Sequence, residues 1–210
     1  MPVKVEYASD EDAPRSFEIE HLAYTESEDP VEPLLFPGPM PPDASEKRAA
    51  IILKHKREDA SIVWLKAVDT ETGQMIGFAQ WHIYEPGKPI PEPPPREFGP
   101  GSNPEVCEAF FGSIDAKRQQ VMGDKPHIFL KFLHTDPKHQ RRGAGSMLIK
   151  WGIQRSEELN LPAYLEATSA GHGLYAKHGF QDIGRLDFDL AKWGGSGTTG
   201  VVLMLRPVPA

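Results

Sequence analysis

The 210-residue sequence contains one cysteine, Cys107, and no apolar run that approaches the length of a membrane span. A single cysteine excludes an internal disulfide framework and favours a reducing compartment. The first residues, Met1 to Lys4, lack the apolar stretch of a signal peptide. We therefore expect a cytoplasmic protein that does not bind a membrane.

Positive charge is also scarce. Lysine and arginine number 23 against 30 aspartate and glutamate residues, which gives a net charge of −7. This balance argues against broad binding to nucleic acid. No histidine has the Cys, His or Asp partners at the spacing of a zinc site, so we expect no metal.

Proline, by contrast, is concentrated in two segments. Six prolines fall in residues 30–42 and seven in residues 86–100. Such segments exclude a long helix or a central strand, and we expect loops at about 30–42 and 86–104. The remaining composition, 39% hydrophobic and 25% charged, is ordinary for a globular protein. We predict one domain over residues 1–210.

Hydrophobic periodicity predicts alternating strands and helices. The sequence predicts a mixed sheet of the α/β (α+β) class, flanked by helices. The expected strands are 3–7, 61–68, 75–84, 127–133, 162–167, 180–190 and 200–205, and the expected helices are 13–24, 44–58, 104–122, 146–159 and 171–178.

A glycine-containing turn lies between the strand that begins at His127 and the helix that follows. It reads Gln140-Arg141-Arg142-Gly143-Ala144-Gly145. The first N–H groups of a helix have no partner within the helix, and its macrodipole is positive there, so such a turn binds phosphate. Lys138, Arg141 and Arg142 add positive charge. The turn is not a P-loop, because no Gly-x-x-x-x-Gly-Lys-Ser/Thr string occurs, and Leu148 stands where a dinucleotide fingerprint needs a small residue.

The turn resembles the pyrophosphate loop of GNAT-superfamily N-acetyltransferases, Gln/Arg-x-x-Gly-x-Gly/Ala. A second segment strengthens this likeness. The strand-like Tyr164-Leu165-Glu166-Ala167 is followed by Leu174-Tyr175-Ala176-Lys177-His178-Gly179-Phe180, which resembles the closing signature of the same family. The two motifs occur in the family's order, and together they cover about residues 127–190.

The resemblance implies a sheet splayed between its fourth and fifth strands, with acetyl-CoA lying across it. The backbone of Leu133 and Thr135 would then bind the pantetheine like an added strand. The N–H groups of Arg141 to Ser146 would bind the diphosphate. The complete cofactor set implied in this way is Leu133, His134, Thr135, Gln140, Arg141, Arg142, Gly143, Ala144, Gly145, Ser146, Ser169 and Tyr175.

The resemblance also implies catalytic roles. Tyr175 matches a family tyrosine near the thioester sulfur, so we expect it to act as general acid. The base stays open, because Phe129 occupies the position of the glutamate that some relatives use. Glu166 is the first candidate and His134 the second, with His82 or a water chain as alternatives. Ser169 stands where many relatives carry an asparagine that contacts the cofactor.

The function expected on this basis is transfer of an acetyl group from acetyl-CoA to a primary amine of a small molecule. A peptide N-terminus or a lysine is an alternative acceptor. Two alternative functions also stay open. The chain could be a non-catalytic acyl-CoA-binding module, or a nucleotide-binding protein that uses the loop differently. Leu34, Leu35 and Phe36 are expected to line the acceptor pocket. The acceptor itself, acyl groups longer than acetyl, and the choice between monomer and homodimer stay open.

Overall fold

One seven-stranded sheet organises the computed structural model, which describes residues 2–25, 29–39, 41–99 and 101–208. The strand order is β1-β2-β3-β4-β5-β7-β6. Only β4 and β5 pair in parallel, so the mixed, mostly antiparallel sheet predicted from the sequence is confirmed. The strands are β1 (Val3–Tyr7), β2 (Ile62–Asp69), β3 (Met75–Tyr84), β4 (His127–Thr135), β5 (Ala163–Ala167), β6 (Gln181–Asp189) and β7 (Thr198–Arg206).

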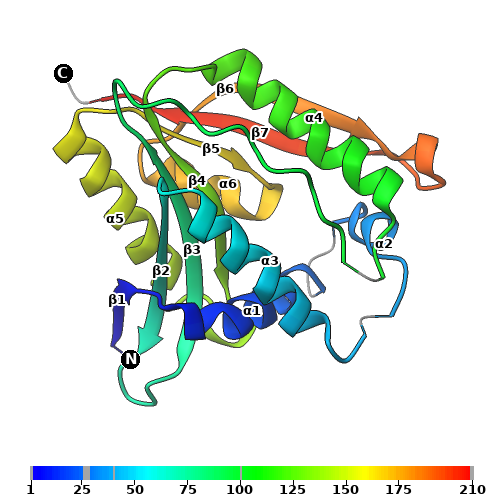
Figure 1. Cartoon of the computed structure of the whole chain (residues 1–210), viewed down its shortest axis with the longest axis horizontal. Coiled ribbons are helices and arrows are strands. Elements are labelled where there is room, and N and C mark those ends of the chain that lie inside the picture. The colour runs from blue at the N-terminus through cyan, green and yellow to red at the C-terminus, as the bar shows by residue number, and fades with distance from the viewer. Residues whose placement is uncertain (1, 26–28, 40, 100, 209–210) are drawn as a thin grey trace.

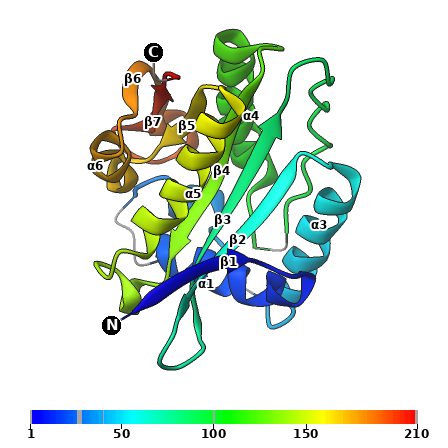
Figure 2. The ribbon, with the colours of Figure 1, turned by 90° about the vertical axis from the view of Figure 1, so that its left-hand side faces the viewer.

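Helices cover both faces of this sheet. Three of them lie on one face (Figure 1), and two lie on the other, beside the N-terminal strands and the C-terminal hairpin (Figure 2). The first three are α1 (Ala13–Thr25), α3 (Ala44–Glu58) and α4 (Pro104–Met122), and the other two are α5 (Ala144–Leu159) and α6 (Ser169–Lys177). A four-residue helix, α2 (Glu32–Leu35), packs against α4.

Side chains of β4 alternate between the two faces, as the strand pleat requires. Ile128 and Leu130 are buried in the main core together with Leu148 and other apolar side chains of α5. Phe129 points the other way, into a smaller core that includes Met122 of α4. The strand that precedes the predicted phosphate loop is therefore held between two packed layers.

Local signals explain the helix ends that the sequence predicts well. α4 begins after Asn103, whose side chain accepts a hydrogen bond from the Val106 N–H at 3.4 Å, and Pro104 is its first residue. It ends at Gly123, which has a φ of +53°. The described residues between Tyr84 and Pro104 form no helix or strand, as the prolines predict.

Several predicted boundaries differ from the structure by one or two residues. Helix α5 begins at Ala144, not at Ser146, because Gly143 in a left-handed conformation is its N-cap. The predicted strand 180–190 ends at Asp189, and a 3-10 helix, Leu190–Trp193, follows it before the chain turns at Gly194, which has a φ of +83°.

Candidate active site

The loop from β4 into α5 presents a row of main-chain N–H groups. Within the described ranges, no N–H group from Arg141 to Ser146 donates a hydrogen bond, whereas the N–H of Met147 binds the Gly143 carbonyl at 3.0 Å. Arg141 has a φ of +62° and Gly143 a φ of +88°. Such left-handed residues turn successive N–H groups toward one side, which makes an anion-binding concavity at the positive end of a helix.

The two glycines of this loop, Gly143 and Gly145, are needed for different structural reasons. A Cβ added at Gly143 would meet nothing within 4 Å, so this glycine is required by its backbone conformation and leaves the loop surface open. A Cβ added at Gly145 would lie 3.1 Å from Leu174 and 3.5 Å from Leu133. Gly145 therefore lets the start of α5 lie close to β4 and α6.

The Arg142 side chain anchors the loop instead of extending from it. Its guanidinium binds the Asp69 carboxylate at 2.8 Å and the His139 ring at 2.7 Å. The charge that the sequence assigns to phosphate at Arg142 is thus already paired with Asp69, whereas its main-chain N–H group is unengaged. Lys138 and Arg141, in contrast, are exposed, as is Gln140.

Strands β4 and β5 separate soon after they meet. Their parallel pairing covers Ile128 to Leu130 on β4 and Ala163 to Leu165 on β5. From Lys131 to Thr135, β4 has no described strand partner on that side, although it still pairs with β3 on the other. An extended ligand can add to this edge as a strand would. The predicted splay between the fourth and fifth strands is confirmed.

His134 lies at this unpaired end of β4. It is buried beneath α1, and its ring centroid is 5.3 Å from that of Tyr24 and 5.9 Å from that of Phe132. Its ring has no hydrogen-bond partner among the described residues. Burial lowers the pKa of His134, so the imidazole is neutral at pH 7. A neutral imidazole can accept a proton.

Tyr175 approaches the same place from α6. It is buried, its ring centroid is 6.2 Å from that of Phe180, and a Cβ on Gly171 would lie 2.8 Å from its ring. Its hydroxyl has no hydrogen-bond partner in the described part of the chain. Burial raises the pKa of Tyr175 to about 12. The charge of an ionised Tyr175 also raises the pKa of Tyr24, so the two phenols lie near each other.

Three carboxylates act electrostatically on Tyr24. Glu20, Asp29 and Glu32 all raise the pKa of Tyr24, although burial is the larger cause. Glu32 is the first residue of α2 and is half-buried. This burial, with the charges of Asp29 and Glu20, raises the pKa of Glu32 to about 7. The site therefore contains a carboxyl group that titrates near neutral pH.

Glu166, the first candidate for the base, is held in an ion pair. Arg118 of α4 donates to its two carboxylate oxygens at 2.8 and 3.3 Å, and the guanidinium stacks on the Phe129 ring at 4.1 Å. Burial raises the pKa of Glu166, and the charge of Arg118 opposes that shift. The carboxylate is thus engaged at both oxygens.

The two other predicted residues are His82 and Ser169. His82 is buried, and its ring nitrogens bind Ser61 at 3.2 Å and Gln80 at 3.0 Å, with Asp59 at 3.3 Å. It is a structural histidine with both nitrogens occupied. Ser169 is exposed in the first turn of α6, beside the end of β5.

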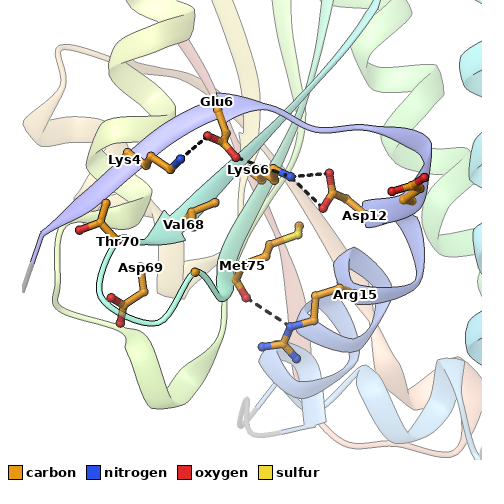
Figure 3. Close-up of a pocket in the computed structure, with 11 residues that line it drawn as sticks. Lys4, Glu6, Asp12, Arg15, Lys66, Val68, Asp69, Thr70 and Met75 are labelled. Atoms are coloured by element: carbon orange, nitrogen blue, oxygen red, sulfur yellow. Dashed lines mark hydrogen bonds and ion pairs between the residues drawn. The ribbon is translucent and has the colours of Figure 1, made fainter.

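A hollow of about 570 Å³ lies elsewhere, at the β1 edge of the sheet. Figure 3 shows that Lys4 points toward Glu6 and Lys66 toward Asp12. Lys66 binds Asp12 at 2.8 Å, and Lys4 binds Glu6 at 2.8 Å. These charges satisfy each other away from the loop and the strand gap. This hollow is therefore not the candidate active site.

Sequence patterns did not point to Tyr24 or Glu32. Tyr24 lies near the end of α1 and Glu32 on a helix of only four residues, and neither belongs to a motif. The proline-rich region between the first two long helices was the available signal. In that region Leu35 is buried against Val106 and Cys107 of α4, whereas Phe36 is 40% exposed.

The described residues contain neither a metal-binding cluster nor a membrane-spanning helix. In the described parts of the chain, no group of three or more His, Cys, Asp or Glu side chains is placed to hold a metal. Nor does any described helix combine the length and apolar composition that crossing a bilayer requires.

Comparison with known proteins identifies the family of this chain. The model of the acetyltransferase (GNAT) family matches residues 23–180. The probable acyltransferase SID5 of Ajellomyces capsulatus is 46% identical over 44 residues, which is 21% of this chain and 32% of that protein. The match therefore spans about a third of this curated relative.

Solved structures share the fold. A structure described as histone acetyltransferase HPA2 and related acetyltransferase, from Corynebacterium glutamicum, has a TM-score of 0.64 at 24% identity, covering 100% of this chain and 98% of that one. The C-terminal condensation domain of Ebony, in complex with beta-alanyl-dopamine, has a TM-score of 0.73 at 14% identity, with 99% and 100% covered. The putative acetyltransferase yncA of Salmonella typhimurium, with its cofactor acetyl-CoA, has a TM-score of 0.59 at 13% identity, with 100% and 96% covered. These likenesses establish the fold, and the family model establishes that this chain belongs to the acetyltransferase (GNAT) family.

Proposed function

We propose that the chain transfers the acetyl group of acetyl-CoA to a primary amine of a small molecule, by direct attack in a ternary complex. The observation that carries this proposal is the row of unengaged N–H groups from Arg141 to Ser146 beside the unpaired edge of β4. The row of N–H groups suits a diphosphate, and the unpaired edge of β4 suits an extended pantetheine arm. Membership of the acetyltransferase family supports the acyl transfer.

In this proposal the cofactor lies along β4 and enters the gap. Main-chain groups of Leu133 and Thr135 bind the pantetheine, with His134 between them, and the loop from Gln140 to Ser146 binds the diphosphate. Ser169, at the start of α6, faces the same ligand. The thioester then lies between β4 and β5, within reach of Tyr175.

The chemical step requires an unprotonated amine and a proton for the departing thiol. The amine nitrogen attacks the thioester carbonyl, the carbon–sulfur bond of the resulting adduct breaks, and the amide forms. Tyr175 donates its hydroxyl proton to the sulfur as general acid. A phenol with a pKa of about 12 remains protonated before reaction, so the proton is present when it is needed.

For the base we now place His134 ahead of Glu166. The His134 imidazole is neutral, has no hydrogen-bond partner among the described residues and lies against Tyr24. Glu166 is occupied by Arg118. Glu32 is a further candidate, because its pKa of about 7 suits proton transfer near neutral pH and the charges of Glu20 and Glu32 attract a cationic amine.

Tyr175→Phe tests the proposal. Release of the free thiol of CoA is measured with a broad panel of small amines, peptides and lysine derivatives. We expect kcat to fall at least about tenfold while the affinity for acetyl-CoA stays the same, because only the donated proton is lost. Tyr7→Phe is the matched control, since Tyr7 is 69% exposed on β1, away from the gap.

The outcomes separate the alternatives. An unchanged kcat in Tyr175→Phe removes the acid role. Acetyl-CoA binding without thiol release from any amine would instead indicate a non-catalytic acyl-CoA-binding module. Tight binding of ATP in place of acetyl-CoA would indicate a nucleotide-binding protein. A cytoplasmic location stays a prediction from the single cysteine.

A further inference from the structure

A β-bulge in β4 sets apart one lysine beside the strand gap. On β3, Gln80 pairs with Phe132 and the next residue, Trp81, pairs with Leu130, so Lys131 is the extra residue of a bulge. Its ammonium lies 5.6 Å from the centre of the Phe132 ring, which places both side chains on the same face. Leu130 is the last residue of β4 that pairs with β5, so Lys131 stands where the two strands separate.

Helices α3 and α4 flank this position on the face shown in Figure 1. Charges on both helices act on the Lys131 ammonium: Arg48 from α3, and Arg118 and Asp115 from α4. Lys131 in turn acts on His55 of α3. The side chain is exposed to solvent, yet surrounding protein is the largest cause of its lowered pKa, and the positive charge of Arg118 adds to the effect.

The neighbouring cations all have carboxylate partners. Arg118 binds Glu166 and Asp115, each at 2.8 Å. Arg48 lies 3.5 Å from Glu20. For Lys131 the described residues provide no carboxylate within 4.0 Å. The Lys131 ammonium is therefore exposed beside the gap without a carboxylate in contact, and it can form a charge-assisted hydrogen bond with an anionic ligand.

We propose that Lys131 binds a carboxylate on the acceptor, so that the acceptors are amines that also carry a carboxylate. This inference rests on the proposed transfer to an amine and specifies its substrate class. The amine must reach the thioester in the gap, and Lys131 is one residue beyond the point where the gap begins. A carboxylate a few bonds away from the amine then meets the ammonium.

Matched acceptors test the inference, namely ornithine with putrescine and histidine with histamine. Each pair differs by one carboxylate. We expect wild-type kcat/KM to favour the carboxylate member by about tenfold or more, the usual size of a charge-assisted hydrogen bond. Lys131→Met should abolish this preference by raising the KM of the carboxylate members, with kcat within about twofold. Lys131→Arg should restore part of it.

The control is Lys150→Met, which removes an exposed lysine of α5 on the opposite face and should leave the preference unchanged. Wild-type enzyme that acetylates both members of each pair equally would overturn the inference. So would a Lys131→Met variant that loses the same factor with both members, because a merely structural lysine would act on all acceptors.

A second measurement does not depend on turnover. Calorimetric binding of N-acetylhistidine and N-acetylhistamine to the CoA-bound protein should favour the carboxylate ligand in wild type and not in Lys131→Met. If no amine releases CoA, the proposed function fails, and equal binding of the two ligands would separately overturn the inference.

Discussion

The two ends of the gap beside β4 are built in different ways. The proposed cofactor end uses the main chain: consecutive N–H groups of one six-residue loop, set by Arg141 and Gly143 in left-handed conformations. The proposed acceptor end uses side chains from separate elements, namely Tyr24 on α1, Lys131 on β4 and Tyr175 on α6. A site made from one loop should fail when the loop geometry fails. A site made from scattered side chains should change one property at a time.

The largest effect is expected at the cofactor end, with Gly143→Val. A β-branched residue is strained at a φ of +88°, so the loop will shift and its N–H groups will no longer converge. We expect the affinity for acetyl-CoA, measured by calorimetry, to fall about a hundredfold, because several hydrogen bonds to the diphosphate are lost together.

Gly73→Val supplies the matched control. Gly73 has a φ of +72°, and a Cβ there would likewise meet nothing within 4 Å, but it lies in the turn between β2 and β3. Both variants should lose about 1–3 kcal/mol of stability. If both also lose acetyl-CoA affinity equally, the loop has no special role.

The next effect concerns the ion pair that borders the acceptor end. Glu166→Gln removes the charge that Arg118 binds at 2.8 Å and leaves the partly buried guanidinium with Asp115 as its remaining carboxylate partner. We expect the free energy of unfolding in urea to fall by about 2 kcal/mol. The exposed pair of Arg155 and Glu158, also 3.0 Å or less apart, provides the comparison, and Glu158→Gln should cost under about 0.5 kcal/mol.

The same variant tests the choice of base. With His134 as base, kcat of Glu166→Gln stays within about threefold of wild type, while His134→Gln lowers it about tenfold. The reverse ranking would return the role to Glu166.

The smallest effect is a pH dependence at Glu32. Its pKa rises from 4.5 to about 7 on folding, so the protonated form is favoured in the native state. The stabilisation of the folded state by the protonated Glu32 is present below pH 4.5 and is lost as pH rises through 7. Glu32→Gln should therefore gain about 1 kcal/mol relative to wild type between pH 5 and pH 8, since partial exposure reduces the full shift.

Thermal or urea unfolding at the two pH values measures this difference. Glu105→Gln, which also removes a carboxylate from the start of a helix, is the control. A gain for Glu32→Gln that is the same at both pH values would mean that its carboxylate does not titrate with folding.

Much of the fold was readable because its signals are local. The predicted helices 44–58 and 104–122 and the strand 75–84 match the structure to the residue, since caps, prolines and turn residues mark their ends. The turn that leads into α5 could be predicted for the same reason, because a few consecutive residues with glycine define it, and phosphate binding at this turn stays a prediction.

The acceptor end was not readable in this way. The bond between Arg118 and Glu166 joins residues 48 positions apart, and the bulge at Lys131 is defined by its partner strand β3. Local periodicity carries no information on either contact. The sequence could thus indicate Glu166 as a candidate base, and only the folded structure shows that Arg118 forms an ion pair with it.

Amide NMR of the isotopically labelled protein, titrated with CoA and separately with pantetheine, tests the central claim most directly. The two ligands share the pantetheine arm, and only CoA carries the diphosphate. We predict large shifts of the amides of Arg141 to Ser146 with CoA, and shifts confined to the β4 edge, around Leu133 and Thr135, with pantetheine. Loop amides that stay unmoved by CoA, or move equally with both ligands, would contradict the account.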